Sequence, residues 1–467
     1  MRDRTVRSQR GSWREVAGGD LVICFHGRGD ALHVHTGGTT MNLKEQSDVV
    51  LTLGQALHVN GQSTDDTLAA TERLSNSLGL RATIIPSWGE LQLEATEGTT
   101  RLVSLVAASP TGVHMERVAS AMKAIDEVTA GHLPPTAALR TIGRISHAPP
   151  APTWLFALAA AAGAASLSVL YGIQHIVAVM LIVLSAAAGA VLRRILAHYS
   201  TNAFLQPLCA ALLAGTIGAF AVRYQLSSPL RLVAVCPCMI LVPGPHVLNG
   251  MMDLSVARIS LGASRLLYAG LVVLAISAGL LLGLGLLGVS LPVGEPGRAV
   301  PLWLDILAAG VAVASFSIFF SMPLRMLGWP VAIGMIAHAM RWWTLSLGGG
   351  ATTGAFVACL VVGLVLTPVA HRCHMPFAAI GFASVVSLMP GVFLFRMSSG
   401  LLQLANSANT TLPLLGATVA DGMIAFTIIL AMSFGLIVPK IVIDRLHLSR
   451  SVYRNSAVVT TARQPQP

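Results

Sequence analysis

The apolar residues of the chain fall into two zones with different spacing. Between positions 153 and 439, apolar runs of near-constant length alternate with short polar connections. Each run is close to the ~20 residues that an α-helix needs to cross the hydrocarbon core of a bilayer. Ten such runs can be distinguished, at 153–171, 174–192, 203–223, 230–249, 264–288, 301–322, 326–345, 350–370, 376–396 and 417–439. The pattern predicts a polytopic α-helical membrane protein.

The stretch before these runs has the mixed spacing of a small soluble domain. Amphipathic helices are predicted at 47–59, 65–78 and 113–128. Short stretches of apolar and β-branched residues, bounded by Pro, Gly, Ser and Thr, predict strands at 81–86, 90–95 and 101–107. We therefore expect an α+β domain at 43–148, which ends in the linker Pro149-Pro150-Ala151-Pro152.

Residues 1–42 have no apolar period. They are rich in Arg, Gly and His and contain no continuous apolar core of the signal-peptide type. We expect a disordered N-terminal extension and place the domain that follows it in the cytoplasm. Because the regular pattern begins at Met41, that methionine is a candidate for the true start of the protein.

Two of the apolar runs contain the same interruption. Pro243-Gly244 breaks one run and Pro390-Gly391 breaks another, 147 positions later. Unpaired backbone groups cost several kcal/mol each in hydrocarbon, so a broken helix persists there only when it is buried in protein or lines a cavity. Paired breaks at corresponding positions of two halves point to the binding site of a transporter. The alternative is a pair of kinked helices without a ligand.

Sliding the chain by 147 positions lays nearly every apolar run before the first break onto one before the second. The sequence thus predicts two five-helix membrane repeats, 149–290 and 299–440, followed by a cytoplasmic tail at 441–467. An odd number of spans inverts the second repeat relative to the first. Lys and Arg concentrate at the run ends that share a side with the α+β domain, which places both termini in the cytoplasm.

Composition agrees with this class. Hydrophobic residues make up 54% of the chain and charged residues 11%, which is too apolar for a soluble globular protein. The net charge of +10 comes from scattered basic residues, so positive-inside charge explains it better than nucleic-acid binding. Most of the six cysteines lie inside apolar runs, and Cys236-Pro-Cys238 is an incomplete ligand set. We expect no disulfide framework, no metal site and no cofactor.

The first break also carries a family resemblance. Pro243-Gly244, Asn249-Gly250 and Asp253-Leu254 resemble the Pro-Gly-x-x-x-x-Asn-Gly-x-x-Asp-Leu signature of the threonine/serine exporter family, as do Gly262 and Arg265-Leu266 further on. The second Pro-Gly pair and the α+β unit resemble corresponding parts of that family, over roughly 45–440. Pro245 departs from the pattern, where a serine is expected.

The resemblance implies export of threonine and serine across the cytoplasmic membrane, driven by the proton motive force. A zwitterionic substrate needs a donor for its carboxylate and an acceptor for its ammonium, and the free backbone ends of a broken helix offer both. The predicted substrate-binding residues are Pro243, Gly244, Asn249, Gly250, Asp253, Pro390 and Gly391. For Asp253, which could bind the ammonium or carry the proton, a capping role is an equal alternative.

Proton coupling needs an ionisable group inside the membrane part, where burial can shift its proton affinity. The candidates are His246, Asp305, His338 and Asp421. Arg396 lies six residues after Pro390; we expect its side chain to extend to the outer interface, although it could also hold a substrate carboxylate.

Two other functions compete with amino-acid export. A dicarboxylate exporter, for example of succinate, would require compensating cations near the breaks, where Arg396 is the nearest candidate. A membrane-embedded enzyme or receptor would require a nucleophile with a base, a metal-ligand set or a phosphate-binding loop, and the sequence contains no such motif. We therefore expect a transporter rather than an enzyme. The sequence leaves open the coupling ion and whether the protein acts as a monomer or a homo-oligomer.

Overall fold

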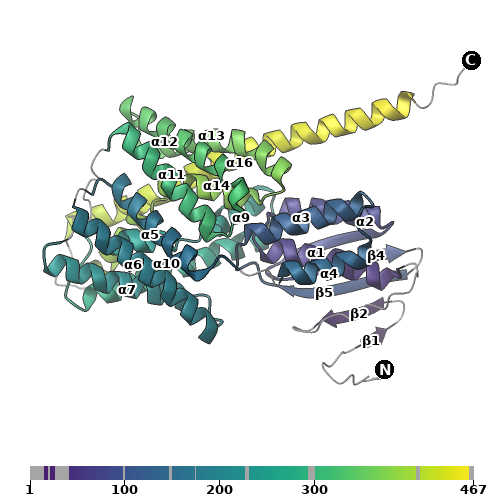
Figure 1. Ribbon diagram of the computed structural model, residues 1–467, viewed down its shortest axis with the longest axis horizontal. Coiled ribbons are helices and arrows are strands. Elements are labelled where there is room, and N and C mark those ends of the chain that lie inside the picture. The colour runs from purple at the N-terminus through teal and green to yellow at the C-terminus, as the bar shows by residue number, and fades with distance from the viewer. Residues whose placement is uncertain are drawn as a thin grey trace, which may run out of the picture.

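The computed structural model divides the chain into two parts (Figure 1). A domain of helices and a β-sheet lies at one end, and a bundle of long helices forms the rest. The described residues are 15–18, 21–26, 41–97, 100–146, 150–173, 175–226, 231–292, 300–405 and 411–461.

The sheet of the α+β domain has five described strands in the order β1-β2-β5-β4-β3. Their bounds are β1 Glu15–Gly18, β2 Leu21–His26, β3 Arg81–Ser87, β4 Gly89–Glu97 and β5 Thr100–Ala108. β3, β4 and β5 form an antiparallel meander, and β2 pairs with β5 in parallel. Alternate residues of β4, namely Leu91, Leu93 and Ala95, are buried, so one face of the sheet supports the domain core.

The N-terminal extension differs in part from the prediction of disorder. Residues 15–18 and 21–26 form β1 and β2, which pair with each other and join the sheet through β5. Both stretches contain β-branched residues but are too short to show a strand period. Residues 1–14, 19–20 and 27–40 lie outside the described part of the chain.

Four helices lie on one side of this sheet (Figure 1). They are α1 Leu43–Val59, α2 Thr64–Ser77, α3 Met115–Thr129 and α4 Pro135–Ser146. α1 begins at a capping box: the Asn42 side chain accepts a hydrogen bond from the Glu45 N–H, and the Glu45 carboxylate accepts one from the Asn42 N–H. The sequence analysis missed α4, whose buried residues Ala138, Ile142 and Ile145 pack it against α1 and α3.

The membrane part consists of two successive sets of helices. The first set is α5 Thr153–Leu170, α6 Ile176–Tyr199, α7 Leu205–Arg223, α8 Leu232–Met239, α9 Gly244–Ser255 and α10 Ile259–Gly285. The second set is α11 Leu302–Phe319, α12 Gly328–Ser346, α13 Ala351–Cys373, α14 Phe377–Val385, α15 Gly391–Ala405 and α16 Leu412–Thr461, with the short 3₁₀ helices η1 Leu324–Met326 and η2 Val386–Leu388.

The two sets pack in corresponding ways. α7 packs against α10 in the first set, and α13 packs against α16 in the second. α5 contacts α6 just as α11 contacts α12, and α5 and α11 pack against each other across the two sets. The correspondence inferred from the two Pro-Gly pairs therefore extends to the order of the helices and to their neighbours.

Seven described helices are long and apolar enough to cross a membrane, and the number rises to nine if each bent pair counts as one span. The bent pairs are α8 with α9, and α14–η2 with α15. α12 takes the place of the seventh predicted run but is not among these helices. The class of polytopic α-helical membrane protein is confirmed, whereas ten spans and an inverted repeat stay predictions.

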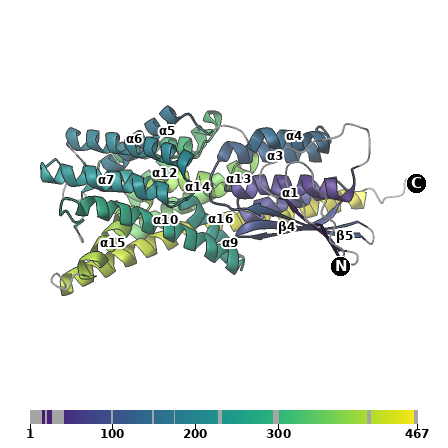
Figure 2. The same ribbon diagram turned by 90° about the horizontal axis from the view of Figure 1, so that it is seen from below.

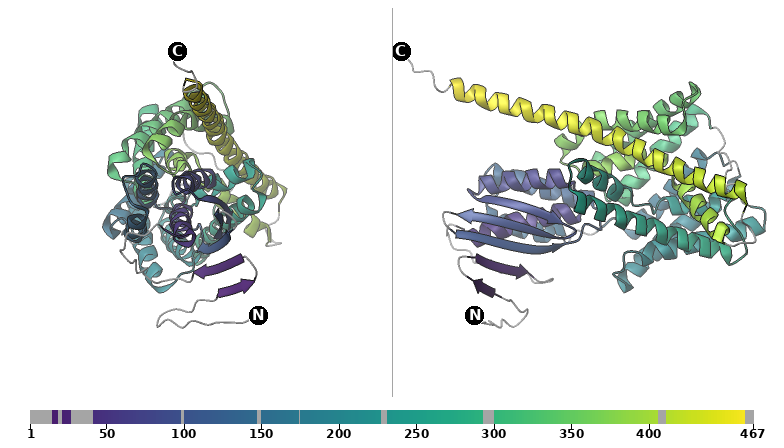
Figure 3. Two further views of the ribbon diagram at one scale, coloured as in Figure 1. Left: turned by 90° about the vertical axis from the view of Figure 1, so that its right-hand side faces the viewer. Right: turned by 180° about the vertical axis from the view of Figure 1, so that it is seen from behind.

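α16 is much longer than the predicted final run. It has 50 residues, from Leu412 to Thr461, which corresponds to about 75 Å at 1.5 Å per residue. The helix runs along the membrane part and continues past the α+β domain (Figure 3). The predicted tail at 441–467 thus continues the last helix as far as residue 461.

Glycines bring the paired helices of each set into backbone contact. A Cβ atom on Gly279 or Gly283 of α10 would collide with backbone atoms of α7. In the second set, a Cβ atom on Gly435 of α16 would lie 2.8 Å from the Phe356 carbonyl oxygen of α13. Helices in a membrane often associate through such small residues. Lipid is as apolar as the side chains, so association depends on close packing and not on a hydrophobic driving force.

The α+β domain lies against one end of the helical bundle (Figure 2) and contacts both sets of helices. The Asn249 amide of α9 donates to the Gly61 carbonyl, and the Met115 N–H of α3 donates to the Phe320 carbonyl at the end of α11. Lys440 Nζ of α16 lies 3.5 Å from Asp66 of α2. The domain therefore bridges the two halves of the membrane part.

Acid should destabilise this domain through His58 of α1. Burial, and secondarily the charge of Arg265, lower the pKa of His58 from 6.5 to about 3. Between those values the unfolded chain binds more protons than the folded chain, so stability falls as the pH drops below 6.5. The loss between pH 7 and pH 5 should be about 2 kcal/mol at this one site.

Thermal unfolding of the purified protein in detergent at pH 7 and pH 5 measures this effect. We expect His58→Gln to lose less of its melting temperature on acidification than the wild type. The exposed His132 provides the matched control, since His132→Gln should keep the full acid sensitivity. Equal acid sensitivity in the wild type and His58→Gln would contradict the assignment.

Candidate functional site

The two Pro-Gly pairs break their helices as predicted. α8 and α9 meet at an angle of 53°, with Pro243 as the N-cap of α9. α14–η2 and α15 meet at 67°, and α15 begins at Gly391. Proline causes both breaks because it has no N–H to donate and its ring clashes with the preceding turn.

The two breaks lie against each other. Gly244 packs directly on the ring of Phe382 of α14, where a Cβ atom would collide with the ring carbons. Gly391 packs against the Met239 side chain at the end of α8, and a Cβ atom there would lie 3.1 Å from Met239 Cγ. The structure therefore brings Pro243-Gly244 and Pro390-Gly391 together from positions far apart in the chain.

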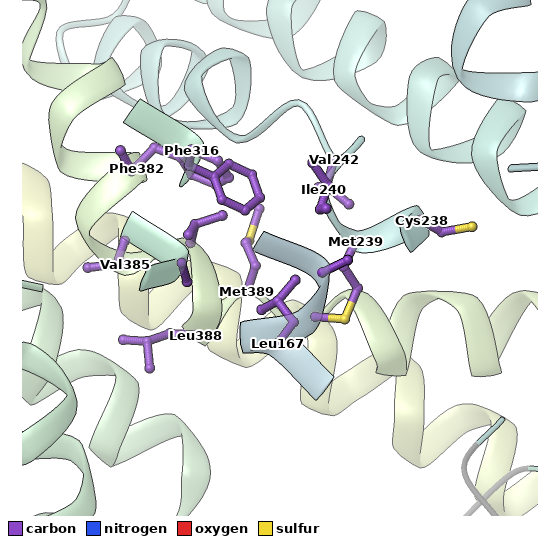
Figure 4. Packing of buried hydrophobic residues seen from close by; sticks show 14 of the residues in the cluster. Leu167, Cys238, Met239, Ile240, Val242, Phe316, Phe382, Val385, Leu388 and Met389 are labelled. Carbon is purple, nitrogen blue, oxygen red and sulfur yellow. The ribbon is translucent and has the colours of Figure 1, made fainter. Parts of the chain in front are cut away.

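The centre between the breaks is apolar and filled. Met239, Ile240 and Val242 from the first break lie in one buried cluster with Phe382, Val385, Leu388 and Met389 from the second, beside Leu167 and Phe316 (Figure 4). The two breaks are therefore closed against each other by apolar side chains.

Asn249, Gly250 and Asp253 lie further along α9 and make structural contacts. A Cβ atom on Gly250 would lie 3.1 Å from the Gly262 carbonyl oxygen, so α9 and α10 touch through their backbones. Asp253 forms a buried ion pair with Arg265, with 3.1 Å between Oδ2 and Nε. The Asn249 amide donates to Gly61 of the α+β domain at 3.2 Å. These residues thus hold the α9–α10 hairpin together and attach the domain to it.

His246 lies in an aromatic group between the α+β domain and the membrane part. Its ring packs edge-on against Tyr268, with 5.1 Å between the centroids. Tyr268 in turn contacts Trp88, which lies between β3 and β4 of the domain. Of the four proton-coupling candidates, His246 is therefore the one at the domain interface.

Asp305 and His338 come together at the second break. Asp305 Oδ2 lies 2.8 Å from His338 Nδ1, and the other ring nitrogen of His338 hydrogen-bonds to the Ser387 hydroxyl of η2. All three side chains are buried, and Ser387 lies three residues before Pro390. The sequence analysis named Asp305 and His338 but missed Ser387. Its hydroxyl, three residues before a predicted break, was the signal that could have identified it.

Asp421 pairs with Arg396, with 3.0 Å between Oδ2 and Nε. Both side chains are buried, with 3% of Asp421 and 4% of Arg396 exposed. The expectation that Arg396 extends to the outer interface is therefore wrong. A charge-matched carboxylate on α16 keeps the guanidinium inside the bundle, because an unpaired buried charge is costly.

Arg265 was missed as a functional residue except as part of the family resemblance. It is fully buried, pairs with Asp253 and lies 3.4 Å from the Thr64 hydroxyl at the start of α2. Arg258 extends the same group by pairing with Asp65 of α2 at 2.6 Å. The available sequence signal was the opposite charge of Asp253 and Arg265, which lie twelve positions apart on either side of the connection between α9 and α10.

Comparison with protein families agrees with this architecture. A ThrE model, described as a threonine/serine exporter, matches residues 48–287, and a second threonine/serine exporter model matches residues 305–442. The two matches cover the two halves of the chain on either side of the link between α10 and α11. Neither a search of curated proteins nor a search of solved structures returned a match. The chain is a fused, two-half member of the threonine/serine exporter family.

Proposed function

We propose that this protein is a secondary transporter that exports threonine and serine from the cytoplasm, driven by the proton motive force. The observation that carries the proposal beyond family membership is the buried Asp305–His338–Ser387 chain beside two broken helices that touch. An ionisable residue inside a membrane bundle suggests a proton or substrate pathway. Broken helices suggest the substrate site itself.

The proposed architecture has ten spans in two inverted five-helix repeats, in the cytoplasmic membrane and with both termini in the cytoplasm. The matching order of helices in the two sets supports it. Counting α12, which lies at the seventh predicted run, raises the number of spans from nine to ten. An inverted repeat places the two breaks on opposite approaches to one central site, as alternating access requires.

We assign the coupling proton to the Asp305–His338 pair. Protonation changes the charge of a pair buried in an apolar bundle, where such a change is costly. The same event alters the hydrogen bond between His338 and Ser387. Because Ser387 belongs to η2 at the second break, the proton would bias how that break packs against the first.

We assign the substrate to the region opened when the breaks separate, with Pro243, Gly244, Asn249, Gly250, Asp253, Pro390 and Gly391 as its frame. The helix starts at Gly244 and Gly391 place backbone polar groups in this region. In the closed arrangement the Gly244 and Gly391 N–H groups donate to the Val242 and Met389 carbonyls. Asn249 contacts the α+β domain, and Asp253 pairs with Arg265. We infer that these two residues fix the position of α9 as well as contact the substrate.

Efflux from cells loaded with threonine through a dipeptide tests the function. We expect protein-dependent efflux of threonine and serine that collapses when a proton uncoupler is added. Succinate efflux measured in parallel decides the dicarboxylate alternative, which Arg396 does not support because Asp421 neutralises it. Efflux of succinate without threonine would replace the proposed substrate, and efflux of neither would reject the proposal.

Asp305→Asn tests the coupling assignment in proteoliposomes. We expect this variant to lose threonine movement driven by an imposed proton gradient, because the amide cannot take up and release the proton. Threonine–threonine exchange, which needs no net proton movement, is the internal control and should continue. Gradient-driven transport that persists at the wild-type level in Asp305→Asn would remove this pair from the coupling mechanism.

Gly244→Ala and Gly391→Ala form a matched pair at the two breaks. Gly244 faces an aromatic ring that cannot move aside easily, whereas Gly391 faces the flexible Met239 side chain. Overpacking costs about 1–3 kcal/mol in a filled core, so Gly244→Ala should lower the melting temperature and threonine efflux strongly, and Gly391→Ala only mildly. Adding the smaller volume change Phe382→Leu to Gly244→Ala should restore part of both. Equal effects of the two alanines would contradict this packing.

A further inference from the structure

We infer that Arg193 of α6 binds the substrate α-carboxylate at a small cavity beside the first helix break. The inference rests on the proposed function in that it takes the substrate to be a carboxylate-bearing zwitterion. It adds a site that the two Pro-Gly pairs and the proton-coupling candidates do not include.

Arg193 packs against two aromatic rings, and two of its three guanidinium nitrogens have no hydrogen-bond partner in the described structure. Its guanidinium lies over the Phe319 ring of α11 at 5.1 Å and near the Phe156 ring of α5 at 5.8 Å. A guanidinium stacked on an aromatic ring can keep its N–H donors for other partners. Nε and Nη1 are buried and have no hydrogen-bond partner among the described residues.

Buried N–H donors of a charged group are rarely left unsatisfied, because each has lost its hydrogen bonds to water without replacement. The neighbouring residue shows the usual solution. Arg194 Nη2 donates to the Ala151 carbonyl at 2.9 Å, and its guanidinium lies over Phe156 at 4.5 Å. Positive-inside charge accounts for two arginines at this end of α6. It does not account for the two unpaired buried nitrogens of Arg193.

The unpaired nitrogens belong to a residue that lines a cavity at the first break. The cavity has a volume of about 10 Å³, close to the room of one water molecule. Its walls include Ser185, Gly189 and Arg193 of α6, together with Ile240 and Leu241 just after α8. Ser185 Oγ is also buried without a hydrogen-bond partner. Two polar groups thus share a cavity that is otherwise lined by alanine, glycine, proline and apolar side chains.

This arrangement matches a zwitterion. A guanidinium can bind a carboxylate through two parallel N–H donors. The carbonyl end of α8, at the same wall, carries the partial negative charge that suits an ammonium. One guanidinium with two open donors matches one carboxylate, so the site favours an amino acid over a dicarboxylate. Threonine is larger than the present cavity, and α8 must move away from α6 for it to enter.

The test compares Arg193→Lys with the matched control Arg194→Lys in purified protein. Lysine keeps the charge but cannot bind a carboxylate through a planar pair of donors. We expect Arg193→Lys to weaken binding of L-threonine by about tenfold or more, the effect of losing a charge-assisted hydrogen bond. Arg194→Lys should bind like the wild type. L-threoninamide, which lacks the carboxylate, should bind weakly to all three proteins and equally to the wild type and Arg193→Lys.

Binding of serine and succinate, measured in the same assay, separates this inference from the proposed function. If the wild type binds succinate and not threonine, the proposed substrate is wrong, and loss of succinate binding in Arg193→Lys still supports Arg193 as the carboxylate anchor. The inference is overturned if Arg193→Lys binds the preferred carboxylate as tightly as the wild type, if threoninamide competes as well as threonine, or if the wild type binds no carboxylate.

Discussion

The contact between the two broken helices is the constraint on which the membrane part depends. Each break exposes backbone groups that lipid cannot satisfy, so each must be buried in protein. The structure buries both breaks in one place, with Gly244 on Phe382 and Gly391 on Met239. Outside that centre, Gly279, Gly283 and Gly435 let α10 pack closely on α7 and α16 pack closely on α13.

The two sets share their framework but differ in their charges. The second set has its buried ionisable groups paired, Asp305 with His338 and Asp421 with Arg396. The first set also has a buried pair, Asp253 with Arg265, and in addition Arg193, whose Nε and Nη1 are buried without a hydrogen-bond partner in the described structure. Protonation of a buried pair changes its net charge, whereas a guanidinium with open N–H donors attracts an anion. This difference supports the proposed division, in which the second half carries the proton and the first half binds the substrate carboxylate.

The α+β domain is part of the same mechanical unit. It contacts α9 through Gly61, α10 through Thr64 and Asp65, and α16 through Asp66. These residues follow one another along a single turn and the start of α2, so one short segment touches both halves of the membrane part. Any movement that separates the halves at this end must also change these contacts.

The sequence by itself determined the class of protein, the two breaks and most of the α+β elements. Apolar run length and proline chemistry are local properties, and they are sufficient for those features. The tertiary structure decided which residues meet. That Asp305 reaches His338 and Ser387, that Arg396 turns inward to Asp421, and that Asn249 attaches a domain depend on helix rotation and packing between segments far apart in the chain. Spacing along one helix carries no information on its partner, so these contacts could not be predicted from the apolar pattern.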